Sequence, residues 1–430
     1  MTMKDFCQKH GLCLTMAQLE QGVQDFLEEM DNGLAGSGSL KMLPAYIDPS
    51  IQPDFSQKVI VIDAGGTNLR IALVSLADLA KPAIEYFENY PMLGTQGELT
   101  CDEFFSQMAD KLAPIADKAK KIGFCFSFPA EILPNRDAKI IEFTKEVKVS
   151  GSAGQLVGAS LLNAMKSKGL PHDLSVTIIN DTVAAQLGGM VGTGGRIFDN
   201  YAGLILGTGS NTCYVEDNSR VTKDANLAQT PGKTLINLES GGYARAPRGD
   251  LDVKYDATTD VPGGQQFEKM VSGAYQGGLF LTLLHAAAEE GCFSAALAAK
   301  IAALNSITAR DTDTFCDFPY GDNVLSNMIG DNEADRGAVY ALVDAFYDRI
   351  ALLMTMNVAP LLIRMDSGKN PWKPVCISAE GTTFYKARLF RPKLDYYMET
   401  YVRQKLGYHY EYVKVENSTI FGTATAGLLG

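Results

Sequence analysis

The feature that most constrains this chain is a pattern of strand, glycine-rich turn and strand that occurs twice. The two copies are VIVIDAGGTNLRIALV at residues 59–74 and AGLILGTGSNTCYVE at residues 202–216. Each copy begins with an apolar run, continues through a turn of Gly, Thr and Asn residues, and ends in a second strand pattern. Copies this far apart are not the units of a solenoid. They predict two related domains, each opening with a hairpin whose tip faces a shared cleft.

The chain has 430 residues, more than one ordinary core holds, which also favours at least two domains. Apolar runs and helical spacing predict the other elements. Predicted strands cover residues 58–63, 69–76, 122–127, 176–179, 202–206, 212–216, 375–378 and 410–415. Predicted helices follow the capping-box pairs Thr15/Gln18 and Thr100/Glu103, start at Asp181, and cover residues 266–290 and 337–358.

Composition excludes several classes of function. The 38 basic and 50 acidic residues give a net charge of −12, which argues against nucleic acid as a partner. The apolar stretch 341–363 contains Asp344, Asp348 and Arg349, so it reads as a buried helix and no membrane partner is expected. The eight cysteines form no C-x-x-C pair, and the N-terminus has no basic-then-apolar leader. These features predict reduced thiols and a cytoplasmic location.

Both glycine turns have the chemistry of a phosphate site. Turns rich in Gly let peptide N–H groups approach phosphate oxygens, and Thr hydroxyls add donors. Asp63, which closes the strand before the first turn, could hold Mg²⁺ through water. The alternative is that both are ordinary hairpin turns and that Asp63 bonds its own backbone. Their occurrence as a pair favours phosphate binding, because one turn from each domain could clamp a single nucleotide.

A set of segments resembles, in the same order along the chain, the motifs of the hexokinases, including glucokinases, of the actin-like ATPase fold. The segments cover most of the chain from Val59 to Lys386. They are VIDAGGTNLR (61–70), GFCFSFP (123–129), FTKEVKVSG (143–151), IINDTVAA (178–185), LILGTGSNTCYVE (204–216), INLESGG (236–242), GQQFEKMVSGAYQGGL (264–279) and ISAEGTTFYK (377–386).

The resemblance implies a role for each matching residue. Asp181 would be the general base, and Lys145 would reach the transferring phosphoryl group as well as the sugar. The residues implied to hold the hexose (glucose, mannose or fructose) are Ser127, Thr144, Lys145, Asn180, Asp181, Asn211, Glu239 and Glu268. Those implied to hold ATP are Asp63, Gly65, Gly66, Thr67, Asn68, Arg70, Gly207, Thr208, Gly209, Gly381 and Thr382, with Asp63 also holding Mg²⁺.

The implied fold is α/β, with two ribonuclease-H-like domains on either side of a cleft. We expect a small domain of residues 58–180 plus 417–430 and a large domain of residues 1–57 plus 181–416. A monomer or a homodimer is expected. The implied activity is transfer of the γ-phosphoryl group of ATP to the 6-hydroxyl of the hexose, feeding glycolysis.

The chain departs from the family pattern in three places. Ser240 follows Glu239 where the family usually has Trp, Glu380 stands where it usually has Asp before the adenosine loop, and residues 418–422 lack its Gly-Ser-Gly-Lys/Arg-Gly run. The last departure leaves the adenine side and the nucleotide preference open. It also motivates a second hypothesis, a sugar-sensing regulatory protein without efficient catalysis. A third is another kinase or ATPase of the same fold, such as an acetate kinase or a chaperone-like ATPase.

Each of the charged residues proposed for the site also has a plainer, purely structural interpretation. Asp181 could be only a helix N-cap or first-turn acid. Glu268 could lie on a solvated helix face, Glu239 could be a loop charge, and Lys145 an ordinary surface lysine. It is the ordered occurrence of all these segments that favours the functional interpretation.

Overall fold

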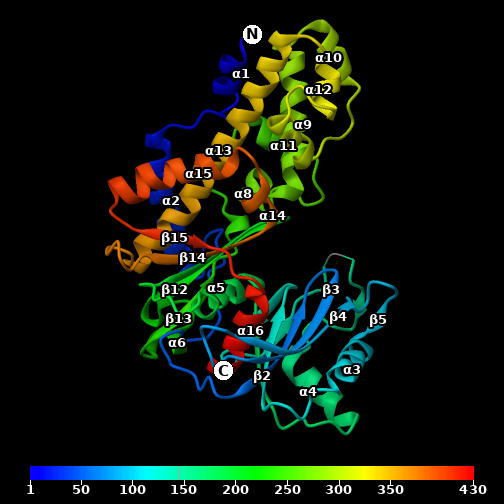
Figure 1. The fold of residues 1–430 in the computed structure, drawn as a ribbon, viewed down its shortest axis with the longest axis vertical. Coiled ribbons are helices and arrows are strands. Elements are labelled where there is room, and N and C mark those ends of the chain that lie inside the picture. The colour runs from blue at the N-terminus through cyan, green and yellow to red at the C-terminus, as the bar shows by residue number, and fades with distance from the viewer. Residues whose placement is uncertain (145) are drawn as a thin grey trace.

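The computed structural model describes residues 1–144 and 146–430 and contains two main β-sheets, one in each half of the molecule (Figure 1). In the five-stranded sheet the first three strands are parallel and the last two pairings are antiparallel. Its strands, in spatial order, are β10 (Ser175–Ile179), β6 (Lys121–Phe126), β2 (Lys58–Ala64), β3 (Asn68–Ser75) and β4 (Ala83–Pro91).

The six-stranded sheet repeats this plan with one added edge strand. In spatial order it contains β15 (Tyr410–Val413), β14 (Val375–Glu380), β11 (Tyr201–Leu206), β12 (Ser210–Asp217), β13 (Lys233–Asn237) and β1 (Leu43–Pro44). Strands β15, β14 and β11 are parallel, and β12 and β13 follow antiparallel, as in the first sheet. The common order and polarity confirm that the two glycine turns open two related sheets.

The side chains of β2 alternate between two apolar clusters, so both faces of the five-stranded sheet are buried. Ile60 and Ile62 pack with α3 (Cys101–Leu112) and α4 (Val157–Ser167). Val59 and Val61 pack on the opposite face with α16 (Ser418–Leu429). Burial on both faces explains why this strand is a continuous apolar run rather than an alternating one.

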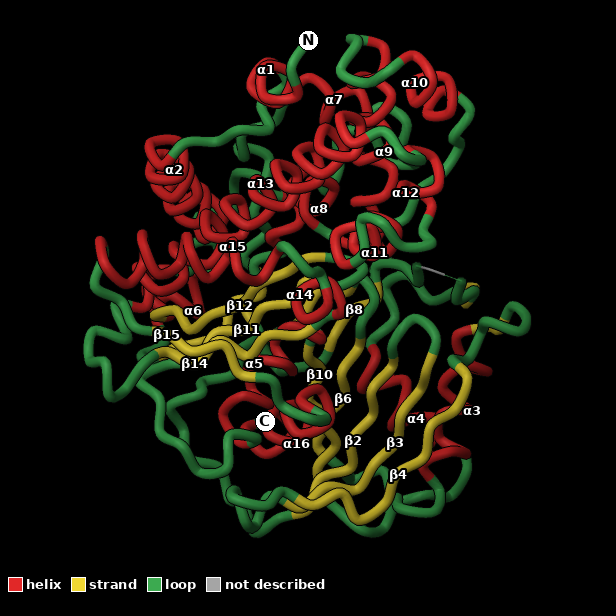
Figure 2. The backbone as a smooth tube through the Cα atoms, turned by 45° about the horizontal axis from the view of Figure 1, so that its top comes forward, coloured by secondary structure: helices red, strands yellow, loops and turns green. Residues whose placement is uncertain are grey.

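Helices α16 and α5 (Asp181–Val191) lie together between the two sheets (Figure 2). They cross at glycines that leave almost no space between the two backbones. An added Cβ on Gly422 would lie 1.8 Å from the carbonyl oxygen of Ala184, and one on Gly188 would lie 2.4 Å from that of Ser418. Helix α16 packs against the five-stranded sheet and α5 against the six-stranded sheet, so this helix pair joins the two sheets. The boundaries of the two domains stay a prediction.

A group of helices covers the far face of the six-stranded sheet (Figure 1). The main ones are α2 (Met16–Leu34), α7 (Asp250–Asp256), α8 (Gln266–Val271), α9 (Gly273–Glu289), α10 (Ala295–Ala302), α11 (Ala309–Asp317), α12 (Val324–Ile329), α13 (Glu333–Met365) and α15 (Phe390–Tyr397). Helix α13 is long and apolar enough to cross a membrane by length and composition, but 89% of its most apolar window is buried within the protein. Its Arg349 donates two bonds, of 2.6 and 2.8 Å, to Asp252. It is the buried helix expected from the sequence, extended in both directions.

The local signals at helix starts are confirmed. Thr15 with Gln18 and Thr100 with Glu103 form reciprocal capping boxes at α2 and α3. The single helix predicted over residues 266–290 is wrong, because the chain breaks at Ser272 into α8 and α9. The break allows Gly273 and Ala274, at the start of α9, to donate their N–H groups to the turn between β11 and β12. That requirement is tertiary, so no local pattern announces it.

The glycine crossing predicts a large cost for a single methyl group. Gly422→Ala should lower the free energy of unfolding by about 1–3 kcal/mol, because backbone atoms rather than a flexible side chain oppose the added Cβ. Urea denaturation of the two proteins measures the difference. Gly337→Ala is the matched control, since this exposed glycine of α13 has no atom within 4 Å of the added Cβ. It should be neutral or stabilising by up to about 1 kcal/mol. Equal behaviour of the two variants would contradict the close crossing.

Candidate active site

The second glycine turn, between β11 and β12, meets two other segments at one edge of its sheet. The N–H of Gly207 donates to the carbonyl of Gly209 at 2.9 Å and closes the turn. The carbonyl of Gly207 accepts from the N–H of Gly273 at 2.8 Å and from Thr383 Oγ1 at 3.1 Å. A Cβ on Gly207 would lie 3.3 Å from Cα of Gly381. The structure therefore makes the predicted phosphate turn and the predicted adenosine loop, with its exposed Thr382, neighbours.

The first glycine turn, between β2 and β3, is closed in a similar way. The N–H of Gly65 donates to the carbonyl of Asn68 at 3.0 Å, and the carbonyl of Thr67 accepts from the N–H of Met92 at 2.9 Å. Gly66 lies half-exposed between them. Two of the predicted nucleotide residues flank the turn and face each other across the strands, since Asp63 on β2 pairs with Arg70 on β3. Arg70 Nη1 donates to Asp63 Oδ2 at 3.0 Å.

Asp63 is buried, with 6% of its surface exposed. Burial raises the pKa of its carboxyl group; Arg70 opposes the increase, and the negative charge of Asp181 adds to it. Strands β10, β6 and β2 are parallel neighbours, so the end of β2 and the start of α5 lie at the same edge of the sheet. The first turn thus lies near the predicted base.

Asp181 is the first residue of α5, and the N-cap is its neighbour Asn180, which follows β10 directly. Asn180 Oδ1 accepts from the N–H of Thr182 at 2.8 Å, and Thr182 Oγ1 donates to Asp181 Oδ1 at 3.2 Å. The N-cap interpretation of Asp181 is therefore wrong, although it is a first-turn acid. Half-buried, it also raises the pKa of groups in both halves of the molecule, among them Asp63 and Glu239.

Glu239 has a left-handed backbone, with φ of 56°, just after β13. Its Oε1 accepts from Asn237 Nδ2 at 2.7 Å and, more weakly, from Asn211 Nδ2 at 3.4 Å. The Oδ1 of Asn211 in turn accepts from the N–H of Ser240 at 3.2 Å, so the strand β12 orients the loop that carries the glutamate. Burial raises the pKa of Glu239, and the bond from Asn237 opposes the increase.

Glu268 lies on α8 and is bound to the second glycine turn. Its Oε2 accepts from the N–H of Ser210 at 2.9 Å. An added Cβ on Gly209 would lie 2.7 Å from the same oxygen, so a larger residue there would displace this carboxylate. Burial raises the pKa of Glu268. The bond from the N–H of Ser210 opposes the increase, and the negative charge of Glu239 adds to it. Half-buried and fixed in this way, Glu268 is not a residue of a solvated helix face.

Of the predicted residues of the small domain, Ser127 lies next to the first glycine turn and Thr144 follows an aromatic cluster. The N–H of Ser127 donates to the carbonyl of Ala64 at 3.1 Å, just after β6 and next to the end of β2. Thr144 is half-buried and follows Phe143, whose ring packs against those of Phe104, Phe126 and Phe128. Lys145, predicted to reach both sugar and phosphate, lies outside the described residues.

Next to the predicted adenosine loop, the structure shows a contact that sequence reasoning missed. Ser418 Oγ, at the start of α16, donates to Glu380 Oε1 at the end of β14, at 2.6 Å. Two residues in positions where the chain departs from the family pattern therefore bind each other. Each departure is visible in the sequence alone, but their contact depends on the parallel pairing of β15 with β14, which brings the start of α16 to the end of β14.

Two further residues near the carboxylates were not predicted. Asn237 holds Glu239, and the positive charge of Lys41 lowers the pKa of the same glutamate. Asn237 is two residues before Glu239, but β13 ends at Asn237 and the backbone of Glu239 is left-handed, so the strand period does not relate the two side chains. Lys41 is distant in sequence and carries no local signal either.

Comparison with known proteins identifies the family of this chain. Two family models, both described as hexokinase, match residues 2–191 and 201–429. The chain belongs to the hexokinase family. The first match ends at residue 191, the end of α5, and the second begins at residue 201, the start of β11.

Curated relatives from plants are moderately similar. Hexokinase-1 of Spinacia oleracea is 32% identical over 296 residues, which is 64% of this chain and 57% of that protein. Hexokinase-4, chloroplastic, of Oryza sativa subsp. japonica is 28% identical over 407 residues, covering 88% of this chain and 78% of that protein. The match spans less than two thirds of the length of the spinach relative, and 60% of the Hexokinase-like 1 protein of Arabidopsis thaliana.

Two solved structures share the fold over almost the whole chain. A hexokinase from Schistosoma mansoni, solved in complex with glucose, has a TM-score of 0.75 at 22% identity and covers 99% of this chain and 98% of its own. A second hexokinase crystal structure has a TM-score of 0.79 at 19% identity, with 99% coverage of both chains. They confirm the α/β fold with two actin-like ATPase domains.

The raised pKa of Glu239 predicts a cost in stability. Above the raised folded pKa the folded protein bears the full cost of the buried charge, and below the ordinary carboxyl pKa both folded and unfolded chains are protonated and the cost is absent. Glu239→Gln should therefore raise the free energy of unfolding at pH 7, and the gain should vanish as the pH falls through this window.

Urea denaturation at pH 7 and pH 4 measures the gain. Glu88→Gln, on the exposed β4, is the control and should change stability little at either pH. A Glu239→Gln protein no more stable than wild type at pH 7 would show that its partners fully compensate for burial.

Proposed function

We propose that the chain is an ATP-dependent hexokinase that transfers the γ-phosphoryl group of ATP to the 6-hydroxyl of glucose or a related hexose. The observation that carries the proposal is geometric. Glu268 and Glu239 both accept bonds from the start of β12, and Asp181 follows a strand that is parallel to β2 and ends at the same sheet edge. Asp63 belongs to the first glycine turn, and Glu239 lies beside Glu268 on the second. Membership of the hexokinase family supports the same conclusion.

The proposed sugar site consists of Glu239, Glu268, Asn180 and Asn211, with Ser127 and Thr144 at its edge. A sugar hydroxyl both donates and accepts, and a carboxylate can accept from two neighbouring hydroxyls. The preset bonds from Asn237 to Glu239 and from Ser210 to Glu268 restrict how these carboxylates can rotate. A site of this kind rejects analogues that lack a hydroxyl, because a buried group would then remain unpaired.

The proposed nucleotide site consists of the two glycine turns and the loop at Gly381 and Thr382. Peptide N–H groups of both turns would bind the phosphates of ATP, and Arg70 adds a positive charge beside the first turn. A magnesium ion carried by nucleotide phosphates needs one or two protein carboxylates rather than a full cage, and Asp63 fits this need through water. The ion would offset the charge of the phosphates.

In the proposed reaction, Asp181 accepts the proton of the 6-hydroxyl while that oxygen attacks the γ-phosphorus. The bond between the γ-phosphorus and the bridging oxygen breaks, and ADP leaves with the electron pair. Phosphoryl transfer requires mainly alignment and neutralisation of charge. The protein therefore needs to supply only one positioned carboxylate as the proton acceptor. Asn180 and Thr182 hold the start of α5 and thereby orient this carboxylate.

Three points stay predictions from the sequence: the choice among glucose, mannose and fructose, the cytoplasmic location, and the monomeric or homodimeric state.

A panel of hexoses and nucleotides in a coupled assay for ADP tests the proposal as a whole. Hexose-dependent release of ADP supports it. Binding of glucose without consumption of ATP would favour the sugar-sensing alternative instead.

Asp181→Asn tests the general base. The variant should lose about 10²- to 10⁴-fold in kcat, because the hydroxyl proton has no acceptor. Glucose affinity should change by only a few-fold, since the amide still hydrogen-bonds. Steady-state kinetics and calorimetry measure the two quantities. Asp102→Asn, another first-turn acid, at the start of α3, is the matched control and should keep full turnover. Undiminished kcat in Asp181→Asn would exclude the assignment.

Hexose binding should also depend on pH. Burial raises the pKa of both Glu239 and Glu268, so they take up protons at a higher pH than an ordinary glutamate, whose pKa is about 4.3. A protonated carboxyl group accepts fewer hydroxyls, so the dissociation constant of the hexose should rise as the pH falls through the raised pKa values. Calorimetric titrations from pH 8 to pH 4 measure it. A constant affinity over this range would argue against carboxylate recognition.

A further inference from the structure

Beside the proposed sugar site, a buried lysine and aspartate join the two ends of one loop. We propose that the Asp256–Lys269 ion pair is a positioning device that fixes Glu268 for hexose recognition. This inference rests on the proposed function. The pair connects α7, which ends at Asp256, to α8, which carries Glu268 and Lys269, and it closes the loop 257–265 between them.

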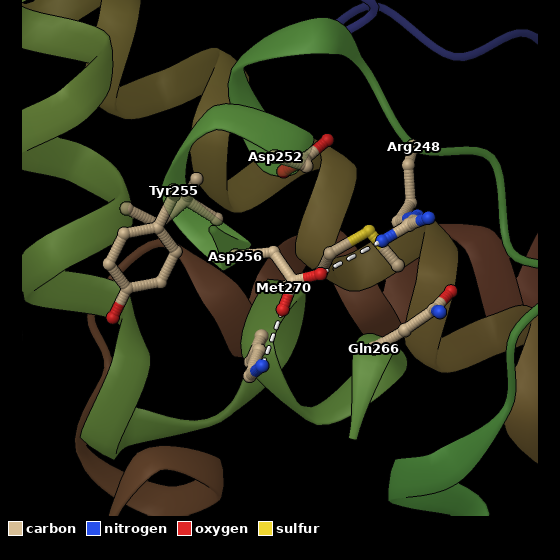
Figure 3. A pocket seen from close by; sticks show the side chains of 8 residues that line it. Arg248, Asp252, Tyr255, Asp256, Gln266 and Met270 are labelled. Carbon is tan, nitrogen blue, oxygen red and sulfur yellow. Dashed lines mark hydrogen bonds and ion pairs between the residues drawn. The ribbon is translucent and has the colours of Figure 1, made fainter. Parts of the chain in front are cut away.

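Asp256 receives donors from three separate segments. Lys269 Nζ donates to Asp256 Oδ1, the N–H of Gly263 donates to Oδ2 at 3.0 Å, and Arg248 Nη1 lies 3.5 Å from Oδ2. Lys269 Nζ also donates to the carbonyl of Val261 at 2.6 Å. Figure 3 shows Asp256 between Arg248 and the α8 segment, with a dashed line from each of its oxygens.

The pair is enclosed by protein. Lys269 is 4% and Asp256 is 8% exposed, and the cavity beside them holds only about 10 Å³. Burial alone would raise the pKa of Asp256, but the bonds from Lys269 and Gly263 more than offset it and keep the pKa below its usual value. The aspartate is therefore held in its charged form, as the fixed acceptor for both ends of the loop.

Helix α8 depends on such contacts because it has only six residues and lacks a side-chain N-cap. Isolated helices of this length are not stable in water. Gln265, the residue before its first turn, has a left-handed φ of 48°. Gln266 Nε2 donates to the carbonyl of Gly263 at 2.9 Å. Lys269 holds one side of the helix to the loop. The adjacent Glu268 extends toward the second glycine turn, where it accepts from Ser210.

A buried ion pair is weak evidence for stability, because desolvation of two charges offsets their attraction. Its directional bonds, however, define one arrangement of the loop and of α8. An apolar pair would fill the space without fixing Val261 and Gly263. The geometry thus points to a role in orienting α8 and its Glu268. An ion pair elsewhere that only stabilised the fold would not have this role.

Lys269→Met removes the charge and keeps most of the side-chain volume. It should raise KM for the hexose about 10- to 100-fold, the effect of displacing a binding group by about 1 Å. It should change kcat and KM for ATP less than about threefold, the signature of lost hexose binding. Discrimination against deoxy sugars should fall at the ring positions where Glu268→Gln also loses it. An unchanged KM for the hexose would overturn the inference.

Arg364→Met is the matched control. Arg364 on α13 pairs with Glu216 on β12, with Nε 3.2 Å from Oε2 and side chains 6% and 3% exposed. This pair is as buried as Asp256–Lys269, and the ion pairs of Arg364 are with Asp31 and Glu216, which lie outside α8 and its loop. The control should lose stability and keep the wild-type KM. If it raised KM for the hexose as much as Lys269→Met, a general loss of stability would explain both.

Amide hydrogen exchange of the sugar-free protein separates failure of this inference from failure of the proposed function. In Lys269→Met, residues 257–268 and the peptide containing Ser210 should exchange faster than in wild type, whereas Arg364→Met should leave them unchanged. Unchanged exchange in Lys269→Met would refute the positioning role even if the wild type binds no hexose. If Lys269→Met does not fold, Asp256→Asn serves instead, because it keeps an acceptor for Gly263 and loses the charge.

Discussion

The close crossing of α5 and α16 is the contact on which the arrangement of this protein depends. Gly188 and Gly422 allow the two helix backbones to touch, and each helix also packs against one of the two related sheets. Asp181 begins α5, so the crossing places the proposed base at the junction of the two halves.

Local signals in the sequence predicted the framework well, because their causes are local. Capping boxes at Thr15 and Thr100 mark helix starts, and the apolar run of β2 reflects burial on both faces. The paired glycine turns predicted two related sheets, which share one strand order. The end of α8 at Ser272 was not predictable, because residues on both sides keep a helical pattern and only the carbonyls of a distant turn explain the break.

The candidate site was predicted through resemblance more than through spacing. The family pattern named Glu239 and Glu268, but nothing local indicates that Asn237 and the N–H of Ser210 hold them. The bond between Ser418 and Glu380 and the ion pair between Asp256 and Lys269 join residues that are distant or separated by a loop. Such partners become visible only when the sheets and helices are in place.

The position of α16 also has a consequence for how the chain is made. Residues 58–179 form a complete sheet, yet one of its faces, which includes Val59 and Val61, is covered by residues 418–429. Lys121 and Arg136 of this early segment donate to the carbonyls of Leu428 and Leu429. During synthesis, an apolar surface of the first sheet must stay exposed until more than two hundred further residues have left the ribosome. Nascent chains of this protein are thus natural clients for chaperones that shield unpaired apolar surface.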